Sequence, residues 1–123
     1  MDTHINYVEL PAPDLAGTKA FYSAAFGWEF VDYGPVYAGY QGPHVEVGLN
    51  SLAVAGPAHA PGSENAVGPL VLFGTDDLAA TEKAVTGAGG AIVSPPYSYP
   101  GGQRFHFRDP SGNILGVYQS AGQ

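Results

Sequence analysis

The sequence predicts an α+β fold built from two consecutive copies of one βαβββ unit. The first observation is an internal repeat, because Asp14–Thr18 reappears with one change as Asp77–Thr81, 63 residues further along the chain. The second is the pattern around each copy, where a short apolar stretch precedes the repeat and glycine follows it. The third is composition, since 45% hydrophobic residues with 18 Gly and 11 Pro are typical of a folded, loop-rich domain.

The first copy starts with an apolar stretch over Ile5–Leu10, which predicts a strand. Asp14 suits the N-cap of a following helix, and Gly27 suits its end. Between them, residues at steps of three or four predict one buried helical stripe, made of Leu15, Thr18, Tyr22 and Ala25. Three extended segments complete the copy: Trp28–Tyr33, Val36–Tyr40 and His44–Leu49.

The second copy follows the same order. Leu70–Phe73 predicts the strand, and Asp76–Asp77 the start of the helix. The helical stripe is Leu78, Thr81, Val85 and Ala88, and the helix is expected to end in Gly87–Gly90. The extended segments are Ala91–Val93, Gln103–Arg108 and Ile114–Gln119, with an irregular segment at Ser94–Gly102 and a tight turn at Asp109–Asn113.

The length of 123 residues predicts one domain over residues 1–123, divided into two modules. The first module spans residues 1–56 and the second spans residues 70–123. Residues 57–69 are rich in Gly, Pro and Ala, which indicates a linker or, alternatively, a lid. The pattern leaves open whether the two modules of one chain pack on each other or on those of a second copy.

The charge and the residue types exclude several classes of function. Four Lys and Arg stand against eleven Asp and Glu, and this net charge of −7 disfavours nucleic acid and anionic membranes as partners. The absence of Cys excludes disulfides and cysteine-ligated metal sites. The chain shows no targeting pattern at its start and no apolar run long enough to cross a membrane, so we expect a cytoplasmic protein.

Several segments spread over nearly the whole chain carry a family resemblance: Val8–Leu15, Ala20–Tyr22, Phe26–Phe30, Asp76–Leu78, Gly89–Gly90 and Phe105–Asn113. With these segments the sequence resembles the vicinal oxygen chelate superfamily, the group of glyoxalase I, bleomycin-resistance proteins, fosfomycin-resistance proteins and extradiol dioxygenases. The most specific parts are Phe-Tyr before Phe-Gly-Trp, and Asp-Pro-x-Gly-Asn near the end. They indicate the scaffold and not the reaction.

The resemblance implies curled mixed sheets that enclose a cavity, helices on the outside, and a homodimer. It also implies where metal ligands would stand: Tyr7, Leu70 and Gly116, with the fourth at Glu46 or Gly48. Leucine and glycine offer no donor atom on a side chain, and tyrosine is a poor ligand until it loses its proton. The chain therefore resembles the metal-free members of the family, and we expect no cofactor.

Alternation along the strands selects the side chains that share a face with these positions. Ten residues are expected to line the pocket: Tyr7, Glu9, His44, Glu46, Leu70, Leu72, Arg104, His106, Gly116 and Tyr118. Apolar walls with a few polar groups are typical of a small-molecule site. Arg104 is a candidate clamp for a carboxylate, and His106 or Glu46 a candidate general base. The alternatives are an ion pair for Arg104, and ordinary hydrogen bonding or solvation for the other two.

The favoured interpretation is a protein that binds a small, largely apolar or aromatic molecule in a cavity without a bound metal. The alternative is a metal-dependent lyase or dioxygenase of the same superfamily that uses displaced ligands, namely His44, Glu46 and His106. A third interpretation is a collapsed cavity in a domain that serves association. The sequence assigns no catalytic residue.

Overall fold

A computed structural model describes residues 3–56 and 69–121, so the predicted linker lies outside the described residues except for Pro69. The first module contains β1 (Tyr7–Pro11), α1 (Leu15–Phe26), β2 (Val31–Asp32), β3 (Tyr37–Gln41) and β4 (Glu46–Asn50). The second contains β5 (Leu72–Gly74), α2 (Leu78–Gly87), β6 (Ala91–Tyr99), β7 (Gly102–Arg108) and β8 (Ile114–Ser120). Two βαβββ units in tandem are therefore confirmed.

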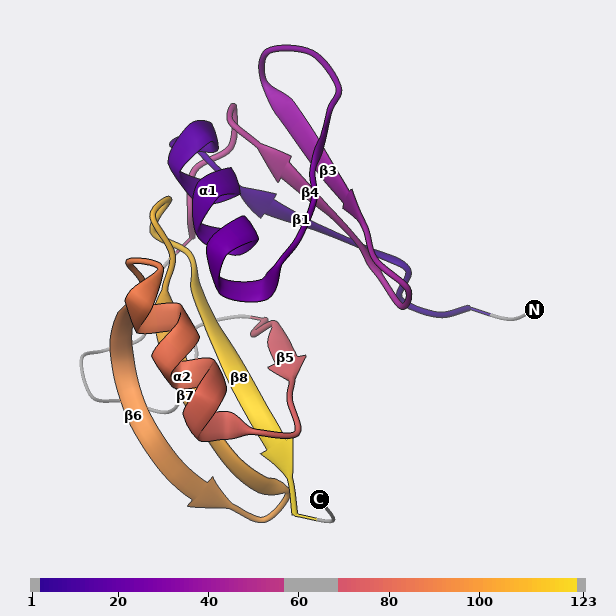
Figure 1. Ribbon diagram of the computed structural model, residues 1–123. Coiled ribbons are helices and arrows are strands. Elements are labelled where there is room, and N and C mark those ends of the chain that lie inside the picture. The colour runs from indigo at the N-terminus through magenta and orange to yellow at the C-terminus, as the bar shows by residue number, and fades with distance from the viewer. Residues whose placement is uncertain (1–2, 57–68, 122–123) are drawn as a thin grey trace.

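Each module forms its own mixed sheet of four strands, in the orders β1-β4-β3-β2 and β5-β8-β7-β6. In both sheets the first strand pairs in parallel with the last strand of the module, and the other pairs are antiparallel. Figure 1 shows each helix lying against its own sheet, with the strongly bent β6 at the outer edge of the second module. The strands β1 and β5 do not pair with each other, so the two sheets do not close into one enclosure.

The helix boundaries follow the capping residues that the sequence predicts. The Asp14 side chain accepts a hydrogen bond from the Gly17 N–H, and the Asp77 side chain accepts one from the Ala80 N–H. At the end of α1, Gly27 adopts a left-handed conformation with φ of 73°, which a glycine reaches without steric cost. Neither helix in the described part of the chain has the length and apolarity needed to cross a bilayer.

One hydrophobic core serves both modules, which shows that the two modules of one chain pack on each other. Phe21 and Tyr22 of α1 belong to the same buried cluster as Phe105 and Phe107 of β7. The rings of Phe21 and Phe107 lie 5.8 Å apart, so the first helix contacts the second sheet directly. Because side chains alternate along a strand, the opposite face of each sheet points away from the helices.

The turn Asp109–Asn113 joins the modules through buried hydrogen bonds. Asp109 is 3% exposed and accepts a bond of 2.8 Å from the Tyr22 hydroxyl. The same carboxylate accepts bonds from the Ser111 N–H and from the N–H and side-chain amide of Asn113. The Ser111 hydroxyl pairs with that of Thr18, and the Asn113 amide donates to the Pro11 carbonyl. The Asp-Pro-x-Gly-Asn motif therefore fixes the position of α1 on the second module.

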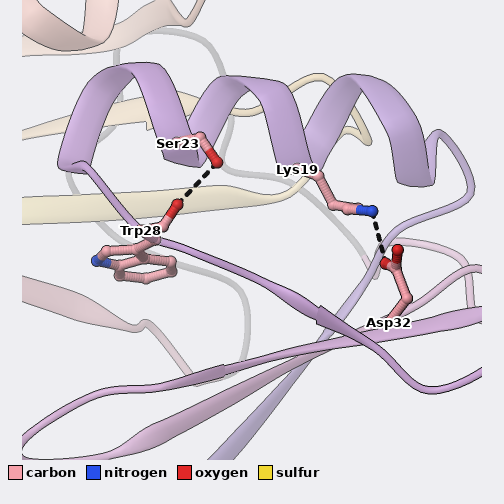
Figure 2. Close-up of polar contacts among 4 residues, drawn as sticks. All are labelled: Lys19, Ser23, Trp28 and Asp32. Carbon is pink, nitrogen blue, oxygen red and sulfur yellow. Dashed lines mark hydrogen bonds and ion pairs between the residues drawn. The ribbon is translucent and has the colours of Figure 1, made fainter.

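The segment after α1 is less regular than expected, because β2 covers only Val31–Asp32 and not the whole of Trp28–Tyr33. Two side chains of α1 hold this segment, as Figure 2 shows. The Ser23 hydroxyl donates to the Trp28 carbonyl at 2.8 Å, and Lys19 forms an ion pair with Asp32 at 2.6 Å. These contacts turn the chain back along the helix and place the Trp28 ring beside the core.

The prediction of an irregular segment at Ser94–Gly102 is wrong, because β6 continues to Tyr99 and β7 begins at Gly102. Its prolines, Pro95 and Pro96, lie between Ser94 and Tyr97, where the pairing of β6 with β7 shifts register. β6 is also the edge strand of its sheet, so only one of its sides carries ladder bonds, and neither proline is paired with a residue of β7. Proline therefore bends this strand without ending it.

Candidate functional site

The strand pairing settles which residue of the first module corresponds to Gly116. Leu72 of β5 pairs with Gly116, and Glu9, the matching residue of β1, pairs with Gly48. Gly48 rather than Glu46 is therefore the equivalent position. The four positions that the resemblance assigns to metal ligands are therefore Tyr7, Gly48, Leu70 and Gly116.

Neighbouring side chains fill the space at both glycines. A Cβ atom at Gly48 would collide with the hydroxyl groups of Tyr7 and Tyr37. At Gly116 the same space is taken by a methyl group of Leu72, with the His106 ring beside it. These residues do not fit a divalent cation, because they offer two phenols and aliphatic carbon where three or four donors are needed.

The displaced ligands do not form a metal site either. Among the described residues, no three His, Asp or Glu side chains lie close enough to share a cation. His44 and Glu46 are exposed at the start of β4 in the first sheet, whereas His106 is fully buried in β7 of the second. The set of His44, Glu46 and His106 that the alternative function requires is therefore not assembled.

On the first sheet, the face opposite α1 carries a chain of hydrogen bonds. The Tyr7 and Tyr37 hydroxyls lie 2.7 Å apart, and Tyr37 donates to Glu9 at 3.0 Å. Asn50 donates to the other oxygen of Glu9 at 3.2 Å. Burial raises the pKa of Tyr37 above its ordinary value, and its bonds to Tyr7 and Glu9 act in the same direction. Tyr37 therefore keeps its proton and is a hydrogen-bond donor, not a metal ligand.

On the second sheet, the equivalent face carries Arg104, His106 and Tyr97. The Tyr97 hydroxyl lies 3.2 Å from Nε2 of His106 and accepts a hydrogen bond from Nε of Arg104. The Arg104 guanidinium also lies over the Tyr97 and Tyr99 rings, 5.5 and 4.8 Å from their centroids. A guanidinium placed over aromatic rings gains cation–π attraction, so this side chain is held in position.

An apolar groove of about 770 Å³ lies between the modules, and we call it the intermodule groove. Its volume falls within the range of roughly 300–1,000 Å³ seen for small-molecule sites. Both modules contribute to its lining, which consists of Ile5, Val8, Leu10, Phe26, Trp28, Tyr40, Gly42, Pro43, His44, Val45, Val47, Pro69, Leu70, Val71, Leu72, Phe73, Gly74, Thr75, Thr81 and Val117. β1 and β5 pair within their own sheets and not with each other, which leaves this space open.

Stacked aromatic rings form one side of the intermodule groove. Trp28 and Tyr40 lie parallel with ring centroids 4.4 Å apart, and Tyr22 stacks behind Trp28 at 5.1 Å. Phe73 of β5 approaches the edge of Trp28 at 5.7 Å from across the modules. Such a column offers flat apolar surface to an aromatic ligand.

The ten residues expected in one pocket lie in three places. Leu70, Leu72 and His44 line the intermodule groove. Tyr7, Glu9 and Glu46 lie on the first sheet, where Tyr7 pairs with Glu46. Arg104, His106, Gly116 and Tyr118 lie on the second sheet, where Tyr118 also borders a smaller polar hollow beside Gly74–Asp76. Tyr7 and Gly116 do not line the intermodule groove, so the expected single hollow is divided.

Sequence reasoning missed several residues that the structure brings to these places. Tyr37 and Asn50 join the network on Glu9 because β3 and β4 pair Tyr37 with Asn50. Trp28 is another such residue, because it packs on the core while also lining the groove. The sequence signal for Trp28 was its position directly after the glycine that ends α1. Its contact with Tyr40 could not be predicted, because that contact depends on how the later strands pair.

Comparison with known proteins supports the resemblance over most of the chain. The family model for the Glyoxalase/Bleomycin resistance protein/Dioxygenase superfamily matches residues 4–117. The chain is 31% identical over 125 residues to the anthracycline biosynthesis protein DnrV of Streptomyces peucetius. The aligned region covers 92% of this chain and 46% of DnrV. The anthracycline biosynthesis protein DauV of Streptomyces sp. (strain C5) matches with the same identity and the same coverage. The chain therefore spans about half the length of these two curated relatives.

Solved structures share the fold over almost their whole length. TnmS3, an antibiotic-binding protein from Streptomyces sp. CB03234, has a TM-score of 0.71 at 25% identity and covers 98% of both chains. A glyoxalase/bleomycin resistance protein/dioxygenase family enzyme from Burkholderia phytofirmans PsJN has a TM-score of 0.74 at 17% identity, covering 96% of this chain and 99% of its own. With the repeated βαβββ topology and the family match over residues 4–117, the chain belongs to the glyoxalase/bleomycin resistance protein/dioxygenase superfamily.

Proposed function

We propose that this chain binds a small, largely apolar or aromatic molecule in the intermodule groove and does so without a metal ion. The observation that carries this proposal is the lining of the groove, where Trp28 and Tyr40 stack beside Phe73. Each ring of a flat ligand that stacks on such a surface gains roughly 0.5–1.5 kcal/mol beyond the burial of its area. The role is binding and sequestration, as in proteins of the bleomycin-resistance type.

Metal independence is supported by the four positions that would hold the ion. Gly48 and Gly116 carry no donor, and their space is filled by phenol groups and by Leu72. The names of two relatives support a small-molecule role, since one is an anthracycline biosynthesis protein and another an antibiotic-binding protein. An anthracycline, which is a fused aromatic ring system bearing a sugar, is therefore the first probe to use.

The test is a titration of doxorubicin, an anthracycline, into the purified chain. Trp28 is the single tryptophan, so its fluorescence reports directly on the groove. We expect saturable quenching and a matching heat of binding in calorimetry. Absence of saturation both with doxorubicin and with a plain polycyclic probe such as anthraquinone-2-carboxamide would overturn the proposal.

A matched pair of variants locates the binding. Leu70→Asp places a charge on the wall of the groove, outside the buried core cluster. The control variant Ala16→Asp adds the same charge outside the groove, at an exposed position in the first turn of α1. Because desolvating a charge opposes the entry of an apolar ligand, we expect Leu70→Asp to weaken binding at least about tenfold. Ala16→Asp should bind as the wild type does, and equal loss in both variants would place the ligand elsewhere.

A further inference from the structure

A smaller hollow of about 440 Å³ adjoins the intermodule groove, and we call it the polar hollow. Its lining residues, apart from one glycine, all carry oxygen on their side chains: Gly74, Thr75, Asp76, Tyr118 and Ser120. Gly74 and Thr75 also line the intermodule groove. The two spaces therefore meet along the same two residues of the chain.

Gly74 marks the boundary between these two spaces. It is the last residue of β5, which is an edge strand of the second sheet, and it pairs with Tyr118 of β8. A Cβ atom at Gly74 would lie 3.6 Å from the Tyr118 ring, so this ring of the polar hollow comes close to a residue of the groove. Because glycine has only a hydrogen atom there, Gly74 puts no side chain between the two spaces.

The chemistry of the lining changes at this boundary. The intermodule groove is mostly apolar and aromatic, but Thr75 and Thr81 in its lining carry hydroxyl groups that lie 2.8 Å apart. Among the described residues that line either space, Asp76 carries the only carboxylate and none is Lys or Arg. Asp76 is exposed, and the ion pair in the described part of the chain joins Lys19 to Asp32 instead. The polar hollow therefore presents a negative charge next to an apolar groove.

We propose that the polar hollow binds a protonated amine on a short arm of the aromatic ligand that the intermodule groove holds. This inference rests on the proposed function and adds the chemical class of the ligand to it. The Asp76 carboxylate supplies the opposite charge, and the Tyr118 ring offers a face that attracts a cation. The arm passes Gly74, where no side chain obstructs it. The site thus selects aromatic amines over neutral molecules of the same shape.

The experiment compares two probes that share one ring system and differ in charge. N-(2-aminoethyl)anthraquinone-2-carboxamide carries an ammonium group at neutral pH, whereas N-(2-hydroxyethyl)anthraquinone-2-carboxamide is neutral and has nearly the same shape. Both are titrated by calorimetry into the wild-type chain at low salt. Because an ion pair at an exposed site contributes little, we expect the amine to bind about three- to fivefold more tightly than the alcohol. This preference should shrink at roughly 0.5 M salt, since salt screens exposed charges.

Asp76→Asn is the test variant, and Glu29→Gln is its matched control. Glu29 is exposed and lines neither space, and both substitutions change the net charge of −7 by the same amount. In Asp76→Asn the two probes should bind equally, within about 1.5-fold, while Glu29→Gln should keep the preference for the amine. The alcohol should bind all three proteins alike, which distinguishes a lost charge contact from a misfolded protein.

Three results would contradict the amine site. Equal affinity of the wild type for the two probes would overturn it and leave the proposed function standing. A preference that survives in Asp76→Asn would also overturn it, because the net charge of the whole chain would then attract the amine. Binding of neither probe would overturn both the amine site and the proposed function.

Discussion

Gly48 shows how one missing side chain changes the chemistry of the site. It lies at the position where the resemblance implies a metal ligand, and its lack of a Cβ makes room for the hydroxyl groups of Tyr7 and Tyr37. Those hydroxyls then bond to each other and, through Tyr37, to Glu9. The Glu9 carboxylate is therefore engaged by neutral donors, Tyr37 and Asn50, rather than left to bind a cation.

Asp109 gives the clearest pH dependence among single residues. Burial raises its pKa above the ordinary value of 3.8, although bonds from Asn113 and Tyr22 act in the opposite direction. The folded chain therefore binds the proton more tightly than the unfolded chain does. The stability that this proton contributes is complete below a pH of about 3.8 and is lost as pH rises through the folded pKa.

Asp109→Asn removes this titration and also an oxygen that accepts buried hydrogen bonds. We expect the variant to be less stable than the wild type, by about 1–3 kcal/mol for each buried donor left unpaired. The difference in free energy of unfolding, measured with urea at several pH values, should be largest below about pH 4 and should shrink as pH rises. A difference that grows with pH would show that the folded pKa is lowered instead.

At the scale of the elements, the caps are the part most directly encoded. Asp77 accepts from the Ala80 N–H at 3.0 Å and begins α2. Asp77→Ala should lower the free energy of unfolding by about 1 kcal/mol, because the N–H groups of the first turn lose their acceptor. The neighbouring Asp76→Ala is the control, since Asp76 is exposed and lies outside the helix. Equal effects of both variants in urea denaturation would contradict the assignment of the cap.

Strands could be predicted from the sequence only where a local pattern of residues indicates them. Apolar stretches before each helix predicted β1 and β5, and the turn Asp109–Asn113 separated β7 from β8. The extension of β6 was missed because Pro95 and Pro96 are ordinarily signs of a loop. Their tolerance depends on β6 being an edge strand, which follows from the whole sheet and not from the segment.

The candidate site was predictable in part for the same reason. Alternation placed Arg104 and His106 on one face of a strand, and the structure brings both to Tyr97. The aromatic side of the groove was not predicted, because Trp28 meets Phe73 only when the two modules pack together. Distances between modules depend on long-range contacts that no local pattern contains.

For the whole molecule, we propose that the chain forms a homodimer. Leu52 and Val54 are 77% and 78% exposed, and Val31 on the edge strand β2 is 50% exposed. Exposed large apolar side chains favour an interface, and two-fold dimers are the commonest assembly. Light scattering after size exclusion should give twice the 12.7 kDa of one chain, and Val54→Asp should shift the mass toward one chain. A wild-type mass of one chain would contradict the proposal.

The most direct test of metal-independent binding is one calorimetric titration carried out in two states of the protein. Doxorubicin is titrated into the chain after treatment with EDTA, and again after addition of Mn²⁺, Fe²⁺, Ni²⁺ or Zn²⁺. Our account predicts the same dissociation constant in all samples, within about twofold. Binding that appears only with a metal, and that His106→Ala abolishes, would contradict it.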